Sequence, residues 1–313
     1  MRPLSPLAAA LLAAAASRGA SPALTVTLLG TGNPRPSAAR GGPAILVEGG
    51  GRAVLFDAGR GAEEAIFARD PASKIDALFL THLHSDHTVG IPDVWLTGWL
   101  FGRAVPLRVF GPAGTSVLCR GLERAYAFDV RTRRDVDEKL PARGADLEPR
   151  ELGDGAVVAE GPLRVTAFLV DHGPVRPALG YRVDFGGHSV VLSGDTRPSD
   201  NLVRHARGVD VLVHEVIAPD AERRGAASSF SREQRERIIA HHSTPEQAGE
   251  VFAKVVPKLA VYSHIVPSFA TAADLVAPTR KSWAGPLEVG EDGMAIEIGD
   301  AVRVIRPPKP VSR

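Results

Sequence analysis

Residues 81–87 (THLHSDH) constrain this chain more than any other feature of its sequence. They hold three histidines and one aspartate, and they directly follow residues 75–80, an apolar run typical of a strand buried on both faces. Such a cluster is costly in a core, whereas imidazole and carboxylate together suit zinc or a similar divalent ion. The spacing lets His82 and His84 point to one side of the strand end, while Asp86 and His87 can face a second ion.

Other predicted strands also end in side chains that can bind a metal. His172 follows the predicted strand 163–170 and Asp195 follows 189–192. His214 is the last residue of the predicted strand 209–214 and Glu215 follows it, and His264 is the last residue of 259–264. Ligand sites in α/β sheets lie at the carboxyl ends of strands. A single histidine in such a place is more often structural, so the repetition carries the prediction of a two-metal site.

The rest of the chain alternates between predicted strands and helices. Further strands are expected at 23–29, 44–48, 53–56, 107–110, 157–160, 179–184, 294–298 and 302–305, and helices at 61–68, 92–101 and 244–255. Residues 131–151 are dense in charge without an apolar period, which predicts an exposed loop or arm. Two similar halves without a linker predict one four-layer α/β domain over residues 21–313.

Residues 1–20 have the composition of a secretory signal peptide. Met1-Arg2 is followed by an alanine- and leucine-rich stretch over residues 4–16, which is too short to span a bilayer. We therefore expect export to the periplasm or secretion, without a stable membrane anchor. The single cysteine, Cys119, is expected to be a buried apolar side chain.

Several motifs together resemble the metallo-β-lactamase superfamily. These are His82-x-His84-x-Asp86-His87, with Asp57-Ala-Gly59 before it and Ser193-Gly-Asp195-Thr after it. The chain is most similar to the tRNase Z and arylsulfatase-like branch, on residues 29–36 (LGTGNPRP), 178–182 (ALGYR), 213–215 (VHE), 242–244 (HST) and 262–264 (YSH). The resemblance implies an αββα sandwich with two zinc ions at one edge, Mn²⁺ and iron being the alternatives.

The resemblance also implies a role for each site residue. His82, His84 and His172 would bind the first ion, Asp86, His87 and His264 the second, and Asp195 would bridge them. Asp57 would orient the histidine loop. Asp86 and Asp195 would orient the attacking water, and Glu215 with His242 would protonate the leaving group. His188 and His205 lie outside every motif and are expected on the surface.

The expected function is that of an exported dinuclear zinc hydrolase of phosphodiesters or sulfate esters. Two alternatives stay open: a β-lactam or lactone hydrolase on the same site, and a metal-binding or redox protein without hydrolytic activity. Redox relatives usually carry a glutamate where His84 stands, and β-lactamases usually lack the Glu215 and His242 pair. Both differences favour ester hydrolysis.

Charge and loop length predict a small substrate. The net charge of +1 provides no strong field for nucleic acid, and the short segment between His172 and Asp195 has no room for the long arm with which tRNase Z grips tRNA. We therefore expect a small-molecule ester as substrate and no nucleic acid; a homodimer stays open. Trp95, Trp99 and Phe101 would form either an aromatic wall for an aryl group or part of the core.

Overall fold

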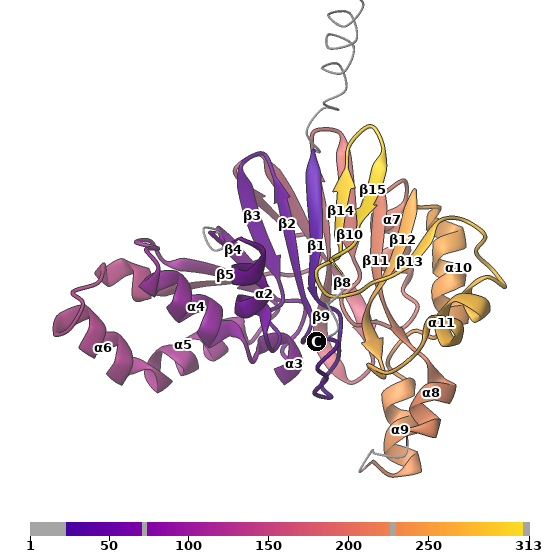
Figure 1. Ribbon diagram of the computed structural model, residues 1–313, viewed down its shortest axis with the longest axis horizontal. Coiled ribbons are helices and arrows are strands. Elements are labelled where there is room, and N and C mark those ends of the chain that lie inside the picture. The colour runs from indigo at the N-terminus through magenta and orange to yellow at the C-terminus, as the bar shows by residue number, and fades with distance from the viewer. Residues whose placement is uncertain (1–22, 71–73, 226–229, 309–313) are drawn as a thin grey trace, which may run out of the picture.

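The computed structural model describes residues 23–70, 74–225 and 230–308, and the predicted signal peptide lies outside them. Its strands form two sheets (Figure 1). The eight-stranded sheet runs in the order β15 (Val302–Ile305), β14 (Ala295–Ile298), β1 (Leu24–Gly30), β2 (Ala44–Gly49), β3 (Arg52–Phe56), β4 (Ala77–Phe79), β5 (Leu107–Gly111) and β6 (Leu147–Glu151). The seven-stranded sheet runs in the order β13 (Leu287–Val289), β12 (Leu259–Val266), β11 (Val211–Ile217), β10 (His188–Leu192), β9 (Val175–Phe185), β8 (Leu163–His172) and β7 (Val157–Glu160).

Helices cover the outer face of each sheet. The first half of the chain contributes α2 (Ala62–Arg69), α3 (Ser85–Thr88), α4 (Ile91–Leu100), α5 (Thr115–Ala125), α6 (Ala127–Asp135) and the 3₁₀ turn η1 (Ala142–Ala145). The second half contributes α7 (Asp200–Ala206), α8 (Pro219–Arg224), α9 (Arg232–Ile239), α10 (Pro245–Val255) and α11 (Ala272–Thr279). None of the helices in these ranges combines the length and apolar character that a bilayer-spanning segment needs.

Three apolar clusters hold the layers together. The first lies between the two sheets, where the rings of Phe56 and Phe79 pack around Tyr181 with centroids 5.2 and 5.6 Å from its ring. The second joins the seven-stranded sheet to α7, α10 and α11, and the third joins the eight-stranded sheet to α2, α4 and α5. The predicted αββα sandwich is therefore confirmed.

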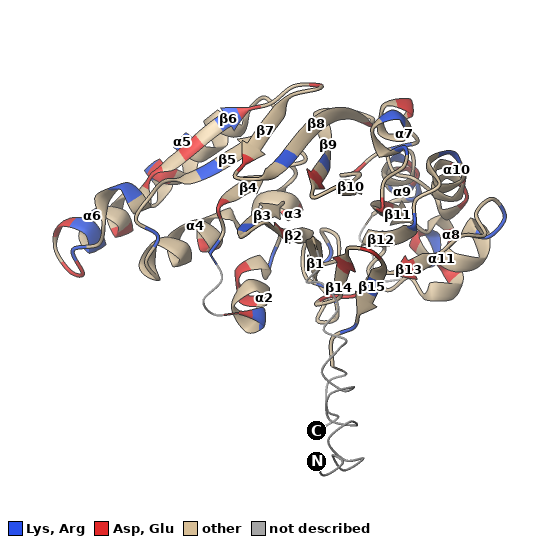
Figure 2. Cartoon of the chain, turned by 90° about the horizontal axis from the view of Figure 1, so that it is seen from above, with Lys and Arg blue, Asp and Glu red and all other residues tan. Residues whose placement is uncertain are grey.

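The charged segment 131–151 is only in part the exposed loop or arm that the sequence predicted: residues 136–141 form neither helix nor strand, whereas the two ends of the segment belong to α6 and β6. Its first part is the end of α6, where Arg133 and Asp129 form an ion pair one helical turn apart and where both basic and acidic residues occur (Figure 2). Its last part is β6, which pairs in parallel with β5 at the edge of the sheet. Only Leu147 is buried in that strand, so the strand carries no apolar alternation.

The aromatic side chains after the histidine cluster belong to the core. Trp95 and Trp99 are fully buried, and their indole N–H groups donate to the carbonyl oxygens of Ala145 and Pro141. Phe101 is exposed and lies outside the pocket described below. The packing interpretation of the two tryptophans is thus confirmed, as is the burial of Cys119.

His205 is not the surface residue that the sequence predicted. Its ring stacks on buried Phe168 with a centroid distance of 4.5 Å, and its Nδ1 lies 2.9 Å from the carbonyl oxygen of Asn201. His188 is half-buried, with Nδ1 3.6 Å from Asp210. His205 faces the sheet because α7, which carries it, packs on β8, whereas His188 is the first residue of β10 itself.

Candidate metal centre

The structure brings together all seven side chains that the sequence predicted as metal ligands. They lie at the carboxyl ends of β4, β8, β10 and β12 and in the short α3. Their ligand atoms form overlapping sets within 4.8 Å of one another: His82, His84 and His172; His82, His87 and Asp195; Asp86, His87 and His264. Asp195 and His264 form a further such set with His242, which the sequence did not predict as a ligand. The predicted proximity is confirmed, and the individual ligand roles stay a prediction.

Asp195 occupies the centre of this cluster. Its Oδ2 lies 3.3 Å from Nε2 of His264, 3.4 Å from Nε2 of His87, 3.8 Å from Nε2 of His82 and 3.9 Å from Nε2 of His172. The chain reaches this place through Gly194, which has φ 59° and whose absent Cβ would lie 2.4 Å from the carbonyl oxygen of Leu179. One buried carboxylate oxygen thus faces both predicted groups of ligands.

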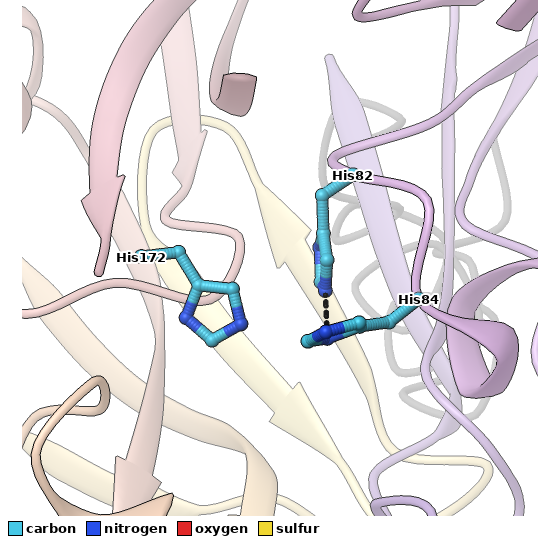
Figure 3. Close-up of side chains that lie close together, drawn as sticks. All are labelled: His82, His84 and His172. Atoms are coloured by element: carbon cyan, nitrogen blue, oxygen red, sulfur yellow. Dashed lines mark hydrogen bonds between the residues drawn. The ribbon is translucent and has the colours of Figure 1, made fainter. Parts of the chain in front are cut away.

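The three histidines of the first group converge from two elements (Figure 3). Nε2 of His82 lies 3.0 Å from Nδ1 of His84, and the ring centroid of His172 lies 4.9 Å from that of His82 and 5.3 Å from that of His84. His82 and His172 are buried, whereas His84 is exposed. The group therefore opens to solvent on the side of His84.

Hydrogen bonds fix how the buried rings present their nitrogens. Nδ1 of His87 donates to Oδ2 of Asp57 at 2.7 Å, and Nδ1 of His172 donates to the carbonyl oxygen of His241 at 2.9 Å. The hydroxyl of Thr81 donates to Asp57, so it accepts from Nδ1 of His82 at 3.0 Å. With Nδ1 carrying the proton, Nε2 of each ring keeps its lone pair for a metal ion.

The backbone is strained at two of these residues. His264 has φ 42°, and it is the extra residue of a β-bulge, because Ser263 pairs with Glu215 while Ile265 pairs with Val216. Asp57 has φ 58° at the end of β3. Left-handed backbone costs about 1 kcal/mol or more for a residue with a Cβ, and it persists where surrounding contacts impose it. At His264 the bulge turns the ring toward Asp86 and Asp195.

The electrostatics of the cluster fit divalent cations. Although burial acts against its charge, the histidines His264 and His87 hold the pKa of Asp195 well below its usual range. Burial lowers the pKa of His82 and His172, which favours the neutral, ligating form of both rings. Buried Nε2 atoms of His87 and His172 have no hydrogen-bond partner within the described structure. Nitrogen atoms around a shared, charged carboxylate are the ligands that zinc and similar ions take.

Glu215 and His242 form a second buried pair beside the metal ligands. Oε1 of Glu215 accepts hydrogen bonds from the backbone N–H groups of Ser243 at 2.8 Å and Thr196 at 3.2 Å. Oε2 therefore faces Nδ1 of His242 at 3.3 Å. Burial raises the pKa of Glu215 to about 8, with Asp195 adding to the effect, and burial lowers the pKa of His242 to about 4. The pair can hold one proton near neutral pH.

His241 is the site residue that sequence reasoning missed. It belongs to no motif, because it directly precedes His242, which begins the HST segment 242–244. In the structure its carbonyl oxygen orients His172, and its ring lies 4.8 Å from that of His172 and lines the pocket over the metal ligands. The carbonyl oxygen that accepts from His172 could not be predicted from the sequence, because every residue type has a backbone carbonyl group.

Fold and site together define a metal-dependent hydrolase. A profile of the "Beta-lactamase superfamily domain" matches residues 52–265. The Ribonuclease Z of Mycolicibacterium gilvum is 34% identical over 287 residues, which cover 89% of this chain and 98% of that protein. The chain belongs to the metallo-β-lactamase superfamily, in the branch that contains ribonuclease Z.

Solved structures with lower identity share the fold. The metallo-β-lactamase fold protein YhfI from Bacillus subtilis has a TM-score of 0.67 at 19% identity and covers 87% of this chain and 98% of its own. The short form of human tRNase Z has a TM-score of 0.64 at 23% identity, covering 88% of this chain and 99% of its own. At these identities the likeness concerns the arrangement of sheets and helices.

The expectation of a small-molecule substrate and no nucleic acid is wrong. The relative that matches along nearly its whole length is named a ribonuclease. The alignment of 287 residues covers 89% of this chain, so the relative has no room for a long insertion within the aligned part. The short segment between His172 and Asp195 therefore does not distinguish this chain from that relative. The net charge failed as evidence because it averages over the whole surface, whereas nucleic acid is bound by local groups.

Proposed function

We propose that this protein is a zinc-dependent phosphodiesterase that cleaves RNA. The observation that carries the proposal is the position of Asp195, whose one oxygen faces four histidine Nε2 atoms at 3.3–3.9 Å beside the Glu215 and His242 pair. The similarity to ribonuclease Z over nearly the whole of that relative supports RNA as the substrate.

The ligand set supports two zinc ions as the cofactor. His82, His84 and His172 would hold one ion, Asp86, His87 and His264 the other, and Asp195 both. Ions held there would neutralise charge on the phosphoryl oxygens and lower the pKa of water to about 7. Manganese and iron are the alternatives, and metal analysis of the purified protein distinguishes the three.

The residues around the predicted metal site would divide the proton transfers between them. Asp86, whose Oδ2 lies 3.4 Å from Nε2 of His264, and Asp195 would orient the attacking water and accept its proton. His242 would give a proton to the leaving oxygen, because Glu215 holds its ring from behind through Nδ1 and leaves Nε2 for the substrate.

The proposal is tested with purified, zinc-loaded protein. We expect cleavage of a tRNA precursor or another structured RNA and of bis(4-nitrophenyl) phosphate, with both activities lost after chelation and restored by zinc. Hydrolysis of the aryl ester without cleavage of any RNA would contradict RNA as the substrate. Turnover of a β-lactam or lactone instead of either phosphodiester would support the alternative hydrolase.

Sulfate ester hydrolysis is a second candidate activity at the same site. The pocket over the metals has an apolar side formed by Ile238, Val266 and Pro267, which suits the ring of an aryl sulfate. Hydrolysis of a sulfate ester, like that of a phosphate ester, is assisted by neutralising the negative charge on the oxygens and by protonating the leaving oxygen. The measurement is release of nitrophenol from 4-nitrophenyl sulfate by the zinc-loaded protein, with Asp195→Ala as the control.

We also propose that residues 1–20 direct export, which would bring the enzyme to RNA outside the cytoplasm. The composition of this segment supports the proposal. In a native exporting host the mature protein should begin between residues 17 and 23. An intact Met1 on protein recovered from that host would contradict export by cleavage of a leader.

A further inference from the structure

A pocket of about 250 Å³ lies over the metal ligands. Its lining includes His84, Asp86, Asp195, His242 and His264, the groups already assigned to the chemistry. The lining also includes Ile238, Val266 and Pro267, which are close in sequence to His242 and His264, and Arg35 and Glu222 from more distant segments. Of the described residues that line the pocket, only Arg35 carries a permanent positive charge.

The loop that carries Arg35 is fixed to the metal centre. The side chain of Asn33 is buried; its Nδ2 donates to the carbonyl oxygen of Ile265 at 2.7 Å, and its Oδ1 accepts from the backbone N–H of Arg35 at 2.9 Å. Ile265 directly follows the ligand His264 in β12. The position of Arg35 is thus set by the strand that supplies a metal ligand.

The guanidinium of Arg35 packs on an aromatic ring, and its N–H groups remain available as hydrogen-bond donors. Its central carbon lies 5.3 Å from the ring centroid of Phe269, which is 48% exposed. In the described ranges no carboxylate makes an ion pair with Arg35. The other ionisable group from this part of the pocket, Glu222, is buried, and burial raises the pKa of its carboxyl group while Arg35 acts in the opposite direction. A planar cation with free donors at the wall of a pocket is suited to bind a phosphate through two hydrogen bonds.

We propose that Arg35 binds a phosphate of the RNA chain next to the one that is cleaved, an inference that rests on the proposed RNA cleavage. The ions that the seven predicted ligands would hold supply the positive charge that the scissile phosphate needs, so the cation of Arg35 in the same pocket is available for a second phosphate. Phosphate contacts of this kind position a nucleic acid without reading its sequence. Arg35 would thus favour a polynucleotide over an ester with a single phosphate.

The test compares two substrates that differ in the second phosphate. An RNA oligonucleotide carries phosphates on both sides of the cleaved bond, and bis(4-nitrophenyl) phosphate carries one phosphate only. For Arg35→Gln we expect KM for the RNA to rise about tenfold with kcat nearly unchanged, the loss of one charged hydrogen-bonding contact. The slope of log KM against log salt should fall by about one, and Arg35→Lys should restore part of the affinity. Hydrolysis of the aryl ester should stay the same.

A matched control and a binding measurement keep the outcome clear. Arg176→Gln removes an exposed arginine that hydrogen-bonds the carbonyl oxygen of Gly173 and does not line the pocket, and it should leave every value unchanged. Equal losses on both substrates in Arg35→Gln would show a structural role and overturn the proposal, as would an unchanged KM for RNA. If fluorescence anisotropy shows that the wild type binds the oligonucleotide without cleaving it, the proposed function fails and the affinity alone tests Arg35. Unchanged affinity in Arg35→Gln would then overturn the inference, as would no binding by the wild type.

Discussion

Asp57 joins two parts of the histidine loop through one carboxylate. Its Oδ2 accepts from Nδ1 of His87 at 2.7 Å and from the hydroxyl of Thr81 at 2.8 Å, and its Oδ1 accepts from the backbone N–H of Thr81, also at 2.8 Å. Asp57 comes from the end of β3, whereas the loop follows β4. The pairing of these two strands therefore sets the direction of the His87 ring before any metal is bound.

Replacing Asp57 should weaken metal binding without removing a ligand. In Asp57→Asn the amide cannot accept all three hydrogen bonds, so His87 loses its fixed ring orientation. We expect metal affinity to fall about 10- to 100-fold, as for other residues that orient a metal ligand. Competition with a chelator measures the affinity, and Asp76→Asn, at the partly exposed ion pair with Arg52, is the control. Wild-type affinity in Asp57→Asn would contradict this role.

Replacing Asp195 should remove the shared ligand of both ions. We expect Asp195→Asn to hold fewer than two metal equivalents, and kcat/KM on bis(4-nitrophenyl) phosphate to fall at least about 100-fold. Elemental analysis of dialysed protein and steady-state kinetics are the two measurements. Asp184→Asn, at the ion pair with Arg182 farther along β9, should retain both ions. Two bound ions with full activity in Asp195→Asn would rule out a bridging ligand.

The ligand-bearing strand ends could be predicted from the sequence because metal chemistry restricts residue type. Histidine and aspartate after apolar runs mark the ends of β4, β8, β10 and β12. Parallel pairing through β11 brings the ends of β10 and β12 to one edge of their sheet, and the packing of the two sheets adds the end of β4. The bulge that aims His264 could not be predicted, because it depends on the register between β11 and β12. The same limit applies to β6, where pairing with β5 makes a strand of residues whose pattern is polar.

The substrate was the hardest feature to predict, because it depends on a few contacts in one pocket. Arg35 is one of 37 basic residues in the chain, and nothing in the composition distinguishes it. Its place in the pocket over the predicted metal ligands results from the hydrogen bonds of Asn33, which join residues 232 positions apart in the sequence. Such long-range anchoring is visible only after folding.

Glu63 on α2 should make the stability depend on pH. Burial, together with the negative charges of Asp93 and Glu64, raises its pKa from 4.5 to about 7, against the effect of Arg103. The folded state therefore holds this proton more tightly than the unfolded chain, so the stabilisation is complete below about pH 4.5 and is lost as the pH rises through about 7. Glu63→Gln should raise the free energy of unfolding by about 1 kcal/mol at pH 8, a value reduced for its partial exposure, and change little at pH 5. Urea unfolding at both pH values measures this; the same gain in Glu250→Gln, at an exposed glutamate of α10, would count against it.

Removing His242 should affect substrates according to their leaving group. Its Nδ1 faces Oε2 of Glu215, and it lines the pocket without being among the predicted metal ligands, so His242→Ala should keep two bound ions. An alkoxide is a poor leaving group that needs a proton, and losing general-acid assistance costs about 10²- to 10⁴-fold in rate. A nitrophenolate leaves without that help, so its release should change far less. The measurement is kcat/KM of His242→Ala on an alkyl and an aryl ester of the same phosphate, with metal content determined on the same preparation. If His242 only begins the turn before α10, both esters should suffer equally; that result, or the loss of an ion, would reject the proton-donor role.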